Sequence, residues 1–134
     1  MRVLFDTNVL IAAFLTHGSS NEVFEHCLSE HTMCVSIGIL DELERSLVRK
    51  LRFPQTRVRE IVRFVSENSE TVETEPLPKP LSRDPDDDHI LGAAIGGRVD
   101  CILTGDQDLL VLGAVGAIRI LSPADFWRFE AERS

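Results

Sequence analysis

Acidic side chains in this 134-residue sequence recur where short apolar runs end, which is where a folded chain could bring them together. Asp6 directly follows a run that ends at Phe5, and Asp106 closes a Thr-Gly-Asp turn after another run. Glu42 lies shortly after a third run, and Asp87 lies in an acidic stretch. Carboxylate oxygens are the ligands that Mg²⁺ and Mn²⁺ prefer, and Mg²⁺ commonly takes substrate phosphate oxygens as well. The four acids are therefore a candidate metal site for chemistry on phosphate.

Each acid also has an ordinary explanation when it is taken alone. Asp6 could cap a helix, and Asp87 could be favoured by a helix dipole. Glu42 could pair with Arg45 on a helix surface, and Asp106 could be a turn residue. Four unpaired carboxylates gathered at one place would repel one another, so bound cations explain the set better than structural roles do.

The elements that would position these acids follow from the alternation of short apolar runs with amphipathic segments. Strands are expected over residues 3–5, 33–35, 101–103 and 118–121, with an extended stretch over 71–75. Helices are expected from Asp6, over 21–30, from Ser36 to Pro54, over 56–68, over 86–95 and from Ser122. This order predicts an α/β fold with a central, mostly parallel sheet covered on both faces. Ligands bind such sheets outside the carboxyl ends of the strands, where Asp6, Ser36 and Asp106 are expected to meet.

Local patterns predict further details of these helices. Gly96-Gly97 is expected to cap the helix over 86–95, and Ser122 is expected to form a capping box with Asp125. The expected core stripe of the helix after Ser36 consists of Leu40, Leu43, Leu47 and Leu51. The expected inward residues of the next helix are Val58, Ile61, Val62 and Val65.

Charge is distributed unevenly along the chain. The net charge is −8, from 14 basic and 22 acidic residues, which by itself does not indicate a nucleic-acid partner. Residues 45–63, however, contain seven basic residues and one acid, a local net charge of +6. We interpret this segment either as a solvated helix face or as a surface for RNA phosphates or an acidic partner. The binding candidates are Arg49, Arg52, Arg57 and Arg59.

Cysteine and histidine usage points away from thiolate and imidazole sites. The cysteines are odd in number, form no C-x-x-C pair and are interpreted as small buried residues of a protein in a reducing compartment; they are Cys27, Cys34 and Cys101. The histidines show no metal-ligand spacing and are interpreted as surface or hydrogen-bonded residues; they are His17, His26, His31 and His89.

Length and hydropathy indicate one domain and no membrane span. The longest uncharged apolar run, residues 109–118, is about half as long as a membrane-spanning helix. Asp6 and Asn8 interrupt the apolar N-terminus, which disfavours a signal peptide. We therefore expect a single cytoplasmic domain over residues 1–134.

The order of the acidic motifs resembles that of PIN domains, and the resemblance extends over essentially the whole chain. No single motif is diagnostic, but four in order at this chain length are specific. The motifs are Phe5-Asp6-Thr7-Asn8-Val9-Leu10, Ile39-Leu40-Asp41-Glu42-Leu43, Asp84-Pro85-Asp86-Asp87-Asp88-His89-Ile90-Leu91 and Thr104-Gly105-Asp106-Gln107-Asp108-Leu109-Leu110, followed by Ile120-Leu121-Ser122-Pro123-Ala124-Asp125-Phe126. The resemblance implies a Rossmann-like three-layer PIN fold and a metal-dependent ribonuclease, of the kind that forms the toxin of prokaryotic toxin–antitoxin pairs.

The resemblance also implies roles for individual residues. By motif position, the catalytic and metal-binding acids would be Asp6, Glu42, Asp87 and Asp106, and Asp108 would be an additional metal ligand. The supporting residues would be Thr7, Asn8 and Thr104. Mg²⁺ or Mn²⁺ is the expected cofactor and would make water a better nucleophile toward the scissile phosphorus, at a site of one or two ions. The expected partners are the RNA substrate, a cognate antitoxin and a second copy of the chain in a homodimer.

Three alternatives stay open. Asp86 or Asp88 could take the place of Asp87, although Asp87 is followed at i+3 and i+4 by apolar residues of an inward helix face. A haloacid-dehalogenase-type phosphatase would need a second Asp two residues after Asp6, where this chain has Asn8. A PIN-like binding module without catalysis would be signalled by loss of an acid, and none of the four is lost.

Overall fold

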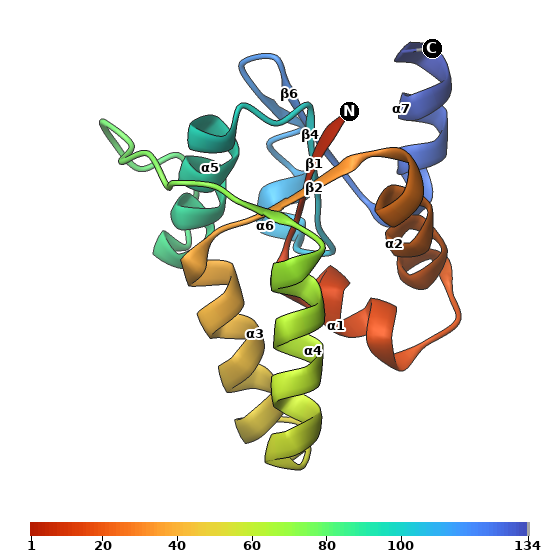
Figure 1. The fold of residues 1–134 in the computed structure, drawn as a ribbon. Helices are drawn as coiled ribbons and strands as arrows, with labels where there is room; N and C mark the ends of the chain where they lie inside the picture. The colour runs from red at the N-terminus through yellow and green to blue at the C-terminus, as the bar shows by residue number, and fades with distance from the viewer. Residues whose placement is uncertain (134) are drawn as a thin grey trace.

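A central sheet organises the computed structural model, which describes residues 1–133 (Figure 1). Its strands are β1 (Arg2–Phe5), β2 (Thr32–Val35), β3 (Glu70–Thr71), β4 (Cys101–Leu103), β5 (Ala114–Val115) and β6 (Ile118–Leu121). They lie in the order β3-β2-β1-β4-β6-β5, and every pairing is parallel except that of β5 with β6. Residues 3–5 and 101–103 are fully buried in the middle of the sheet, as continuous apolar runs in covered parallel strands should be.

Helices connect and cover these strands. They are α1 (Thr7–Leu15), α2 (Ser19–Glu30), α3 (Ile37–Arg49), α4 (Gln55–Glu67), α5 (Pro85–Gly97), α6 (Gln107–Leu110) and α7 (Phe126–Arg133). In Figure 1, α5 lies on one side of the sheet, α2 and α7 lie on the other, and α3 and α4 extend together beyond its carboxyl edge. The predicted α/β fold with a central, mostly parallel sheet is confirmed. Among residues 1–133, no helix combines the length and the apolar character that crossing a membrane requires.

The inward face of α3 differs from the expected leucine stripe. Its buried apolar residues are Ile39, Leu43 and Leu47, spaced at i, i+4 and i+8. Leu40 is only half-buried, and Leu51 is 36% exposed. The prediction therefore holds for Leu43 and Leu47 and in part for Leu40, which packs against the core, and it was wrong at Leu51 because the helix ends before that residue. In α4 the expected inward residues are buried or half-buried; they are Val58, Ile61, Val62 and Val65.

Close packing rather than capping explains the glycines of α5. The helix continues through Gly96 and ends at Gly97, and it is capped by Arg98, whose φ of 52° is left-handed. A Cβ atom on Gly96 would lie 1.9 Å from the carbonyl oxygen of Glu73, so the chain after β3 runs directly against the helix there. The prediction that Gly96-Gly97 caps a helix ending at residue 95 was therefore wrong, because Gly96 packs against backbone and Gly97 packs against the side chain of Val72.

The C-terminal helix also begins differently from the prediction. The hydroxyl of Ser122 donates to Oδ2 of Asp125 at 3.1 Å and makes no hydrogen bond to a backbone N–H group. The backbone N–H of Asp125 donates to the carbonyl of Ser122, which closes a 3₁₀ turn over Pro123–Asp125. The capping box is thus not formed, because this tighter turn precedes α7 and the helix starts only at Phe126.

The cysteines lie in the core as small apolar residues. All three are buried and free of disulfide bonds, as the sequence predicted. Burial raises the pKa of the Cys27 and Cys101 thiols to about 12, so both stay protonated at neutral pH.

Candidate metal centre

Asp6 lies at the junction between β1 and α1, with both carboxylate oxygens held. It caps α1 by accepting from the backbone N–H of Thr7 at 2.7 Å, and its own N–H donates to Leu103 at the end of β4. The hydroxyl of Thr104 donates to the second carboxylate oxygen at 2.7 Å. The residue is only 7% exposed, so this carboxylate is fixed in place and mostly removed from water.

Thr104 links Asp6 to the next acid along the sheet edge. Its hydroxyl accepts from the backbone N–H of Asp106 at 3.0 Å while donating to Asp6. Asp106 caps α6 by accepting from the N–H of Asp108 at 2.9 Å. One buried hydroxyl therefore links two acidic residues that follow different strands, Asp6 after β1 and Asp106 after β4.

Asp87 joins this group from the first turn of α5. Carboxylate oxygens of Asp87, Asp106 and Asp108 all lie within 4.8 Å of one another. Asp87 is 5% exposed, and the hydroxyl of Ser82 donates to it at 3.0 Å. The outermost member, Asp108, is also paired with the guanidinium of Arg83 at 3.0 Å.

The three consecutive acids of α5 have different surroundings. Asp86 is exposed, and its backbone N–H donates to the capping residue Asp84. Asp88 accepts from two backbone N–H groups of the preceding loop at 3.0 and 3.1 Å. Asp87 alone among the three reaches Asp106 and Asp108, because only its position faces the sheet edge.

Glu42 stands apart from this compact group. Its side chain on α3 is 36% exposed, and Oε2 lies 3.6 Å from Nε2 of His89. It is close enough for its negative charge to raise the pKa of Asp6. The structure therefore places Glu42 at the margin of the acidic cluster, on the side where α3 faces α5.

A groove of about 590 Å³ begins at this margin. It is bordered by α3, by α5 and by Thr74 of the segment between β3 and α5. Its basic side chains are Arg45 and Arg49 of α3 and Lys50, which directly follows this helix. Arg45 and Lys50 were not singled out from the sequence, although the helical spacing of Glu42, Arg45 and Arg49 was a usable signal.

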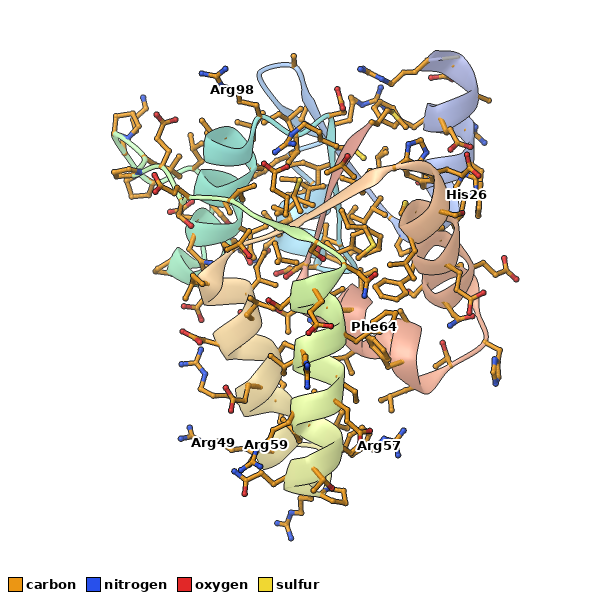
Figure 2. The ribbon with its side chains drawn as sticks, viewed as in Figure 1. His26, Arg49, Arg57, Arg59, Phe64 and Arg98 are labelled. Atoms are coloured by element: carbon orange, nitrogen blue, oxygen red, sulfur yellow. The ribbon has the colours of Figure 1, made fainter. Side chains whose placement is uncertain are left out.

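The arginines expected to bind RNA or a partner do not form one patch. Figure 2 shows Arg49 and Arg59 on one side of the α3–α4 pair and Arg57 on the other. Arg57 stacks over the ring of Phe53, 4.4 Å from its centroid, and Arg52 lies between the helices with a φ of 53°. Residues two apart on a helix point to different sides, so the run of charge in the sequence is split in space.

Two of the acids have raised pKa values. Burial is the main cause at Asp87, together with a hydrogen bond and negative charge from Asp106, and these raise the pKa to about 7 despite the Ser82 hydroxyl. Burial also raises the pKa of Asp6, partly offset by hydrogen bonds from Thr104 and Thr7. Both shifts mean that burial and neighbouring acids disfavour the ionised form of these two carboxyl groups.

The expected supporting residues have different surroundings. Thr104 is fully buried and holds two acids through its hydroxyl. The hydroxyl of Thr7 is also buried, and it has no hydrogen-bond partner within residues 1–133. Asn8 is exposed on the first turn of α1. Ser82 was missed because the proline-rich loop that carries it gave no signal of its return to the sheet edge.

This ordered series of acids also matches a known family model. The model, described as PIN domain, matches residues 2–108. The chain belongs to the PIN-domain family. PIN domains are generally nucleases, which are hydrolases, and they typically use divalent metal ions. The phosphatase alternative thereby loses its support.

The PIN domain also has a similar solved structure. That structure is VapBC2 from Rickettsia felis bound to a DNA fragment from their promoter, and one of its chains superposes with a TM-score of 0.67. The match covers 91% of this chain and 98% of that chain at 15% sequence identity, so the likeness concerns the fold. No curated protein matches the sequence.

The donor set of the PIN domain suits a hard divalent cation. Carboxylate oxygens from Asp87, Asp106 and Asp108 converge within 4.8 Å, and Asp6, which is buried, brings a fourth acid to the same edge. Burial is the main cause of the raised pKa values of Asp6 and Asp87, and the negative charge of neighbouring acids adds to it. Oxygen-only ligation favours Mg²⁺ and Mn²⁺ over metals that prefer nitrogen or sulfur.

Proposed function

We propose that this PIN domain is a metal-dependent ribonuclease in which Asp6, Glu42, Asp87 and Asp106 hold the metal and perform catalysis. Asp108 would be a further ligand. The observation that carries the proposal is the convergence of Asp87, Asp106 and Asp108 at the sheet edge where Asp6 also lies, with Asp6 and Asp87 buried. Glu42 lies at the margin of this group. An acidic cluster of this kind is unfavourable by itself and becomes favourable when it binds a cation.

The chain's own residues would fix the reacting groups. Thr104 would keep Asp6 and Asp106 in register, and Ser82 would orient Asp87 through its 3.0 Å hydrogen bond. When bound, Mg²⁺ or Mn²⁺ would supply Lewis acidity to a phosphate and make water more acidic.

The basic side of the groove would position the substrate. Arg45, Arg49 and Lys50 line it next to Glu42, so an RNA strand in the groove would pass the acids with its phosphates neutralised. These three cations would offset the acids of the same lining, which are Asp41, Glu42 and Asp86 and which would themselves repel RNA.

The direct test is cleavage of labelled RNA by purified protein with Mg²⁺ or Mn²⁺. Asp6→Asn keeps the shape of the side chain and removes its charge, so activity should fall by orders of magnitude. Asp125→Asn, an exposed substitution outside the centre, should cleave like wild type. EDTA should stop the reaction, and a DNA strand of the same sequence tests the choice of RNA. Full activity of Asp6→Asn in a preparation free of contaminating nuclease would refute the assignment.

We also propose that the protein is the toxin of a toxin–antitoxin pair. The support is the fold likeness to a chain of the VapBC2 complex, together with apolar side chains exposed on α1, α3, α4 and the loop after α3. These side chains are Leu15, Ile37, Val48, Leu51 and Phe64. Co-expression with the product of the adjacent open reading frame should yield a complex with reduced nuclease activity. Light scattering on the protein alone tests the expected homodimer, and failure to form the complex would leave only the nuclease proposal standing.

A further inference from the structure

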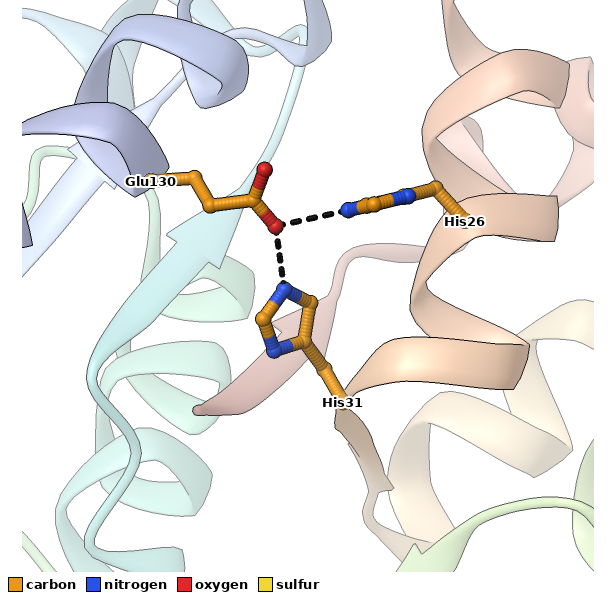
Figure 3. Close-up of side chains that lie close together, drawn as sticks. All are labelled: His26, His31 and Glu130. Carbon is orange, nitrogen blue, oxygen red and sulfur yellow. Dashed lines mark hydrogen bonds and ion pairs between the residues drawn. The ribbon is translucent and has the colours of Figure 1, made fainter. Parts of the chain in front are cut away.

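Two histidines and a glutamate meet on the side of the molecule where α2 faces α7 (Figure 3). Nε2 of His26 lies 2.6 Å from Oε2 of Glu130, and Nε2 of His31 lies 2.5 Å from the same oxygen. His26 comes from α2, His31 follows the end of that helix, and Glu130 comes from α7. Their side chains are 29%, 11% and 25% exposed, so the group is sheltered but reachable from solvent.

We propose that His26, His31 and Glu130 form a binding site for a zinc-type transition-metal ion, separate from the acidic cluster. The ligand atoms lie within 4.8 Å of one another. Two imidazole nitrogens and one carboxylate oxygen are a donor set that Zn²⁺ takes in proteins, with a fourth position left for water. Mg²⁺ prefers oxygen ligands and would not compete strongly for it.

The two candidate sites lie at opposite edges of the sheet. His31 directly precedes β2, and Met1, whose nitrogen lies 2.9 Å from Nδ1 of His31, directly precedes β1. Asp6 follows the carboxyl end of β1. A strand of this length spans roughly 13 Å, so metal bound at one edge does not contact the ligands of the other.

Only a small rearrangement would be needed to admit the ion. Ligand atoms around a tetrahedral zinc ion lie roughly 2.0–2.2 Å from the metal and so roughly 3.4 Å apart. The two imidazoles now donate Nε2 protons to one carboxylate oxygen. A neutral imidazole can carry its proton on Nδ1 instead, which frees Nε2 to bind metal. For His31 this change costs the contact with Met1, so metal binding must outweigh that hydrogen bond.

The single tryptophan of the sequence provides a local reporter. The ring of Trp127 lies 4.8 Å from that of His26, so a paramagnetic ion held by His26 should quench its fluorescence. Untagged full-length protein is titrated with Co²⁺ in excess Mg²⁺, and Zn²⁺ is followed by calorimetry and by melting temperature. The variants are His31→Gln, His26→Gln and Glu130→Gln, each checked for folding by circular dichroism. His17→Gln, at an exposed histidine outside the group, is the matched control.

The proposal predicts saturable quenching with one ion per chain and a Zn²⁺-induced rise of several degrees in melting temperature. His31→Gln and His26→Gln should each weaken binding at least about tenfold, because even the loss of a group that hydrogen-bonds to a metal ligand costs about 10–100-fold in affinity. His17→Gln should not change binding. Absence of saturable quenching would overturn the proposal, as would equal affinity in wild type and a folded His26→Gln or His31→Gln. In that case the group serves only to dock α7 through hydrogen bonds. Neither outcome bears on RNA cleavage, which is assayed at the other edge.

Discussion

The two edges of the central sheet gather titratable side chains in opposite ways. At the carboxyl edge, acids collect without enough positive charge, and the pKa of Asp87 rises to about 7. At the amino edge, burial works against the charge of Glu130, but hydrogen bonds from His31 and His26 outweigh it and lower the pKa. The acids of the carboxyl edge would thus be stabilised by a bound cation. At the amino edge the charge of Glu130 is already stabilised by the two histidines, so a metal ion would have to replace these hydrogen bonds.

This difference predicts that removing an acid will have opposite effects at the two edges. Asp87→Asn should stabilise the metal-free protein at neutral pH by about 1–3 kcal/mol, because one pKa unit corresponds to about 1.4 kcal/mol. It should also abolish most of the rise in melting temperature that Mn²⁺ causes in wild type. Thermal melts with EDTA and with Mn²⁺ measure both effects.

Asp86→Asn is the matched control for this experiment, since Asp86 is the exposed neighbour of Asp87. It should leave the Mn²⁺ effect intact. If Mn²⁺ shifts wild type and Asp87→Asn equally, Asp87 is not a ligand and the contrast between the edges fails.

Substrate binding should depend on the groove side of α3 and not on the far side of α4. Reversing charge at both Arg45 and Arg49 should weaken RNA binding roughly tenfold and flatten its dependence on salt by about 0.7 per lost phosphate contact. Arg57→Glu, on the other side of the helical pair, should change neither quantity. RNA affinity is measured by fluorescence anisotropy at several salt concentrations. If only Arg57→Glu weakens binding, the RNA contacts the far side of α4 and not the groove.

The contributions of the two edges to stability should depend on pH with opposite signs. A carboxyl whose pKa is raised in the folded state favours folding at low pH, and the advantage disappears as pH rises through that pKa. In EDTA, wild type should therefore lose stability between the ordinary pKa of 3.8 and about 7 by comparison with Asp87→Asn. Glu130 has the opposite sign, because its lowered pKa gives stability that is lost as pH falls. Urea unfolding from pH 4 to 8 checks the first trend; no difference between the two proteins would contradict it.

An effect of opposite sign to that of Asp87→Asn is expected for Glu130→Gln. This substitution keeps the shape of the side chain but weakens two hydrogen bonds to one oxygen, so unfolding should become easier by about 1–3 kcal/mol at pH 7. Urea unfolding in EDTA measures it, with Glu132→Gln on the exposed part of α7 as the control. A change as small as that of the control would mean that α7 does not depend on this contact.

The sequence was informative wherever short-range chemistry decides structure. Apolar runs located the buried strands, and an acid directly after a run, as at Asp6, was brought to the carboxyl edge by the parallel topology. The choice of Asp87 over its neighbours followed from helical periodicity and agrees with its burial. The catalytic roles of these residues still rest on the proposed experiments.

The sequence was uninformative where distant segments meet. Nothing local to His26 and His31 indicated that Glu130, about a hundred residues away, would lie between them. The same holds for Gly96, which resembled a helix cap because the backbone that it contacts belongs to another segment. Ser122 shows a second limit, since its pattern fits a capping box and the chain forms a tighter turn instead.

The contact between α5 and the chain after β3 fixes the position of the helix that carries Asp87. A Cβ atom on Gly92 would lie 2.4 Å from the carbonyl oxygen of Glu75, and one on Gly96 would lie closer still to that of Glu73. Alanine at either position must push the helix away from this seam. Asp87 lies near the other end of α5, roughly 13 Å from Gly96 along the helix axis. A methyl group added at Gly92 or Gly96 would thus displace Asp87 from the other acids without changing any charge. Such a substitution is suited to making a temperature-sensitive variant of the protein.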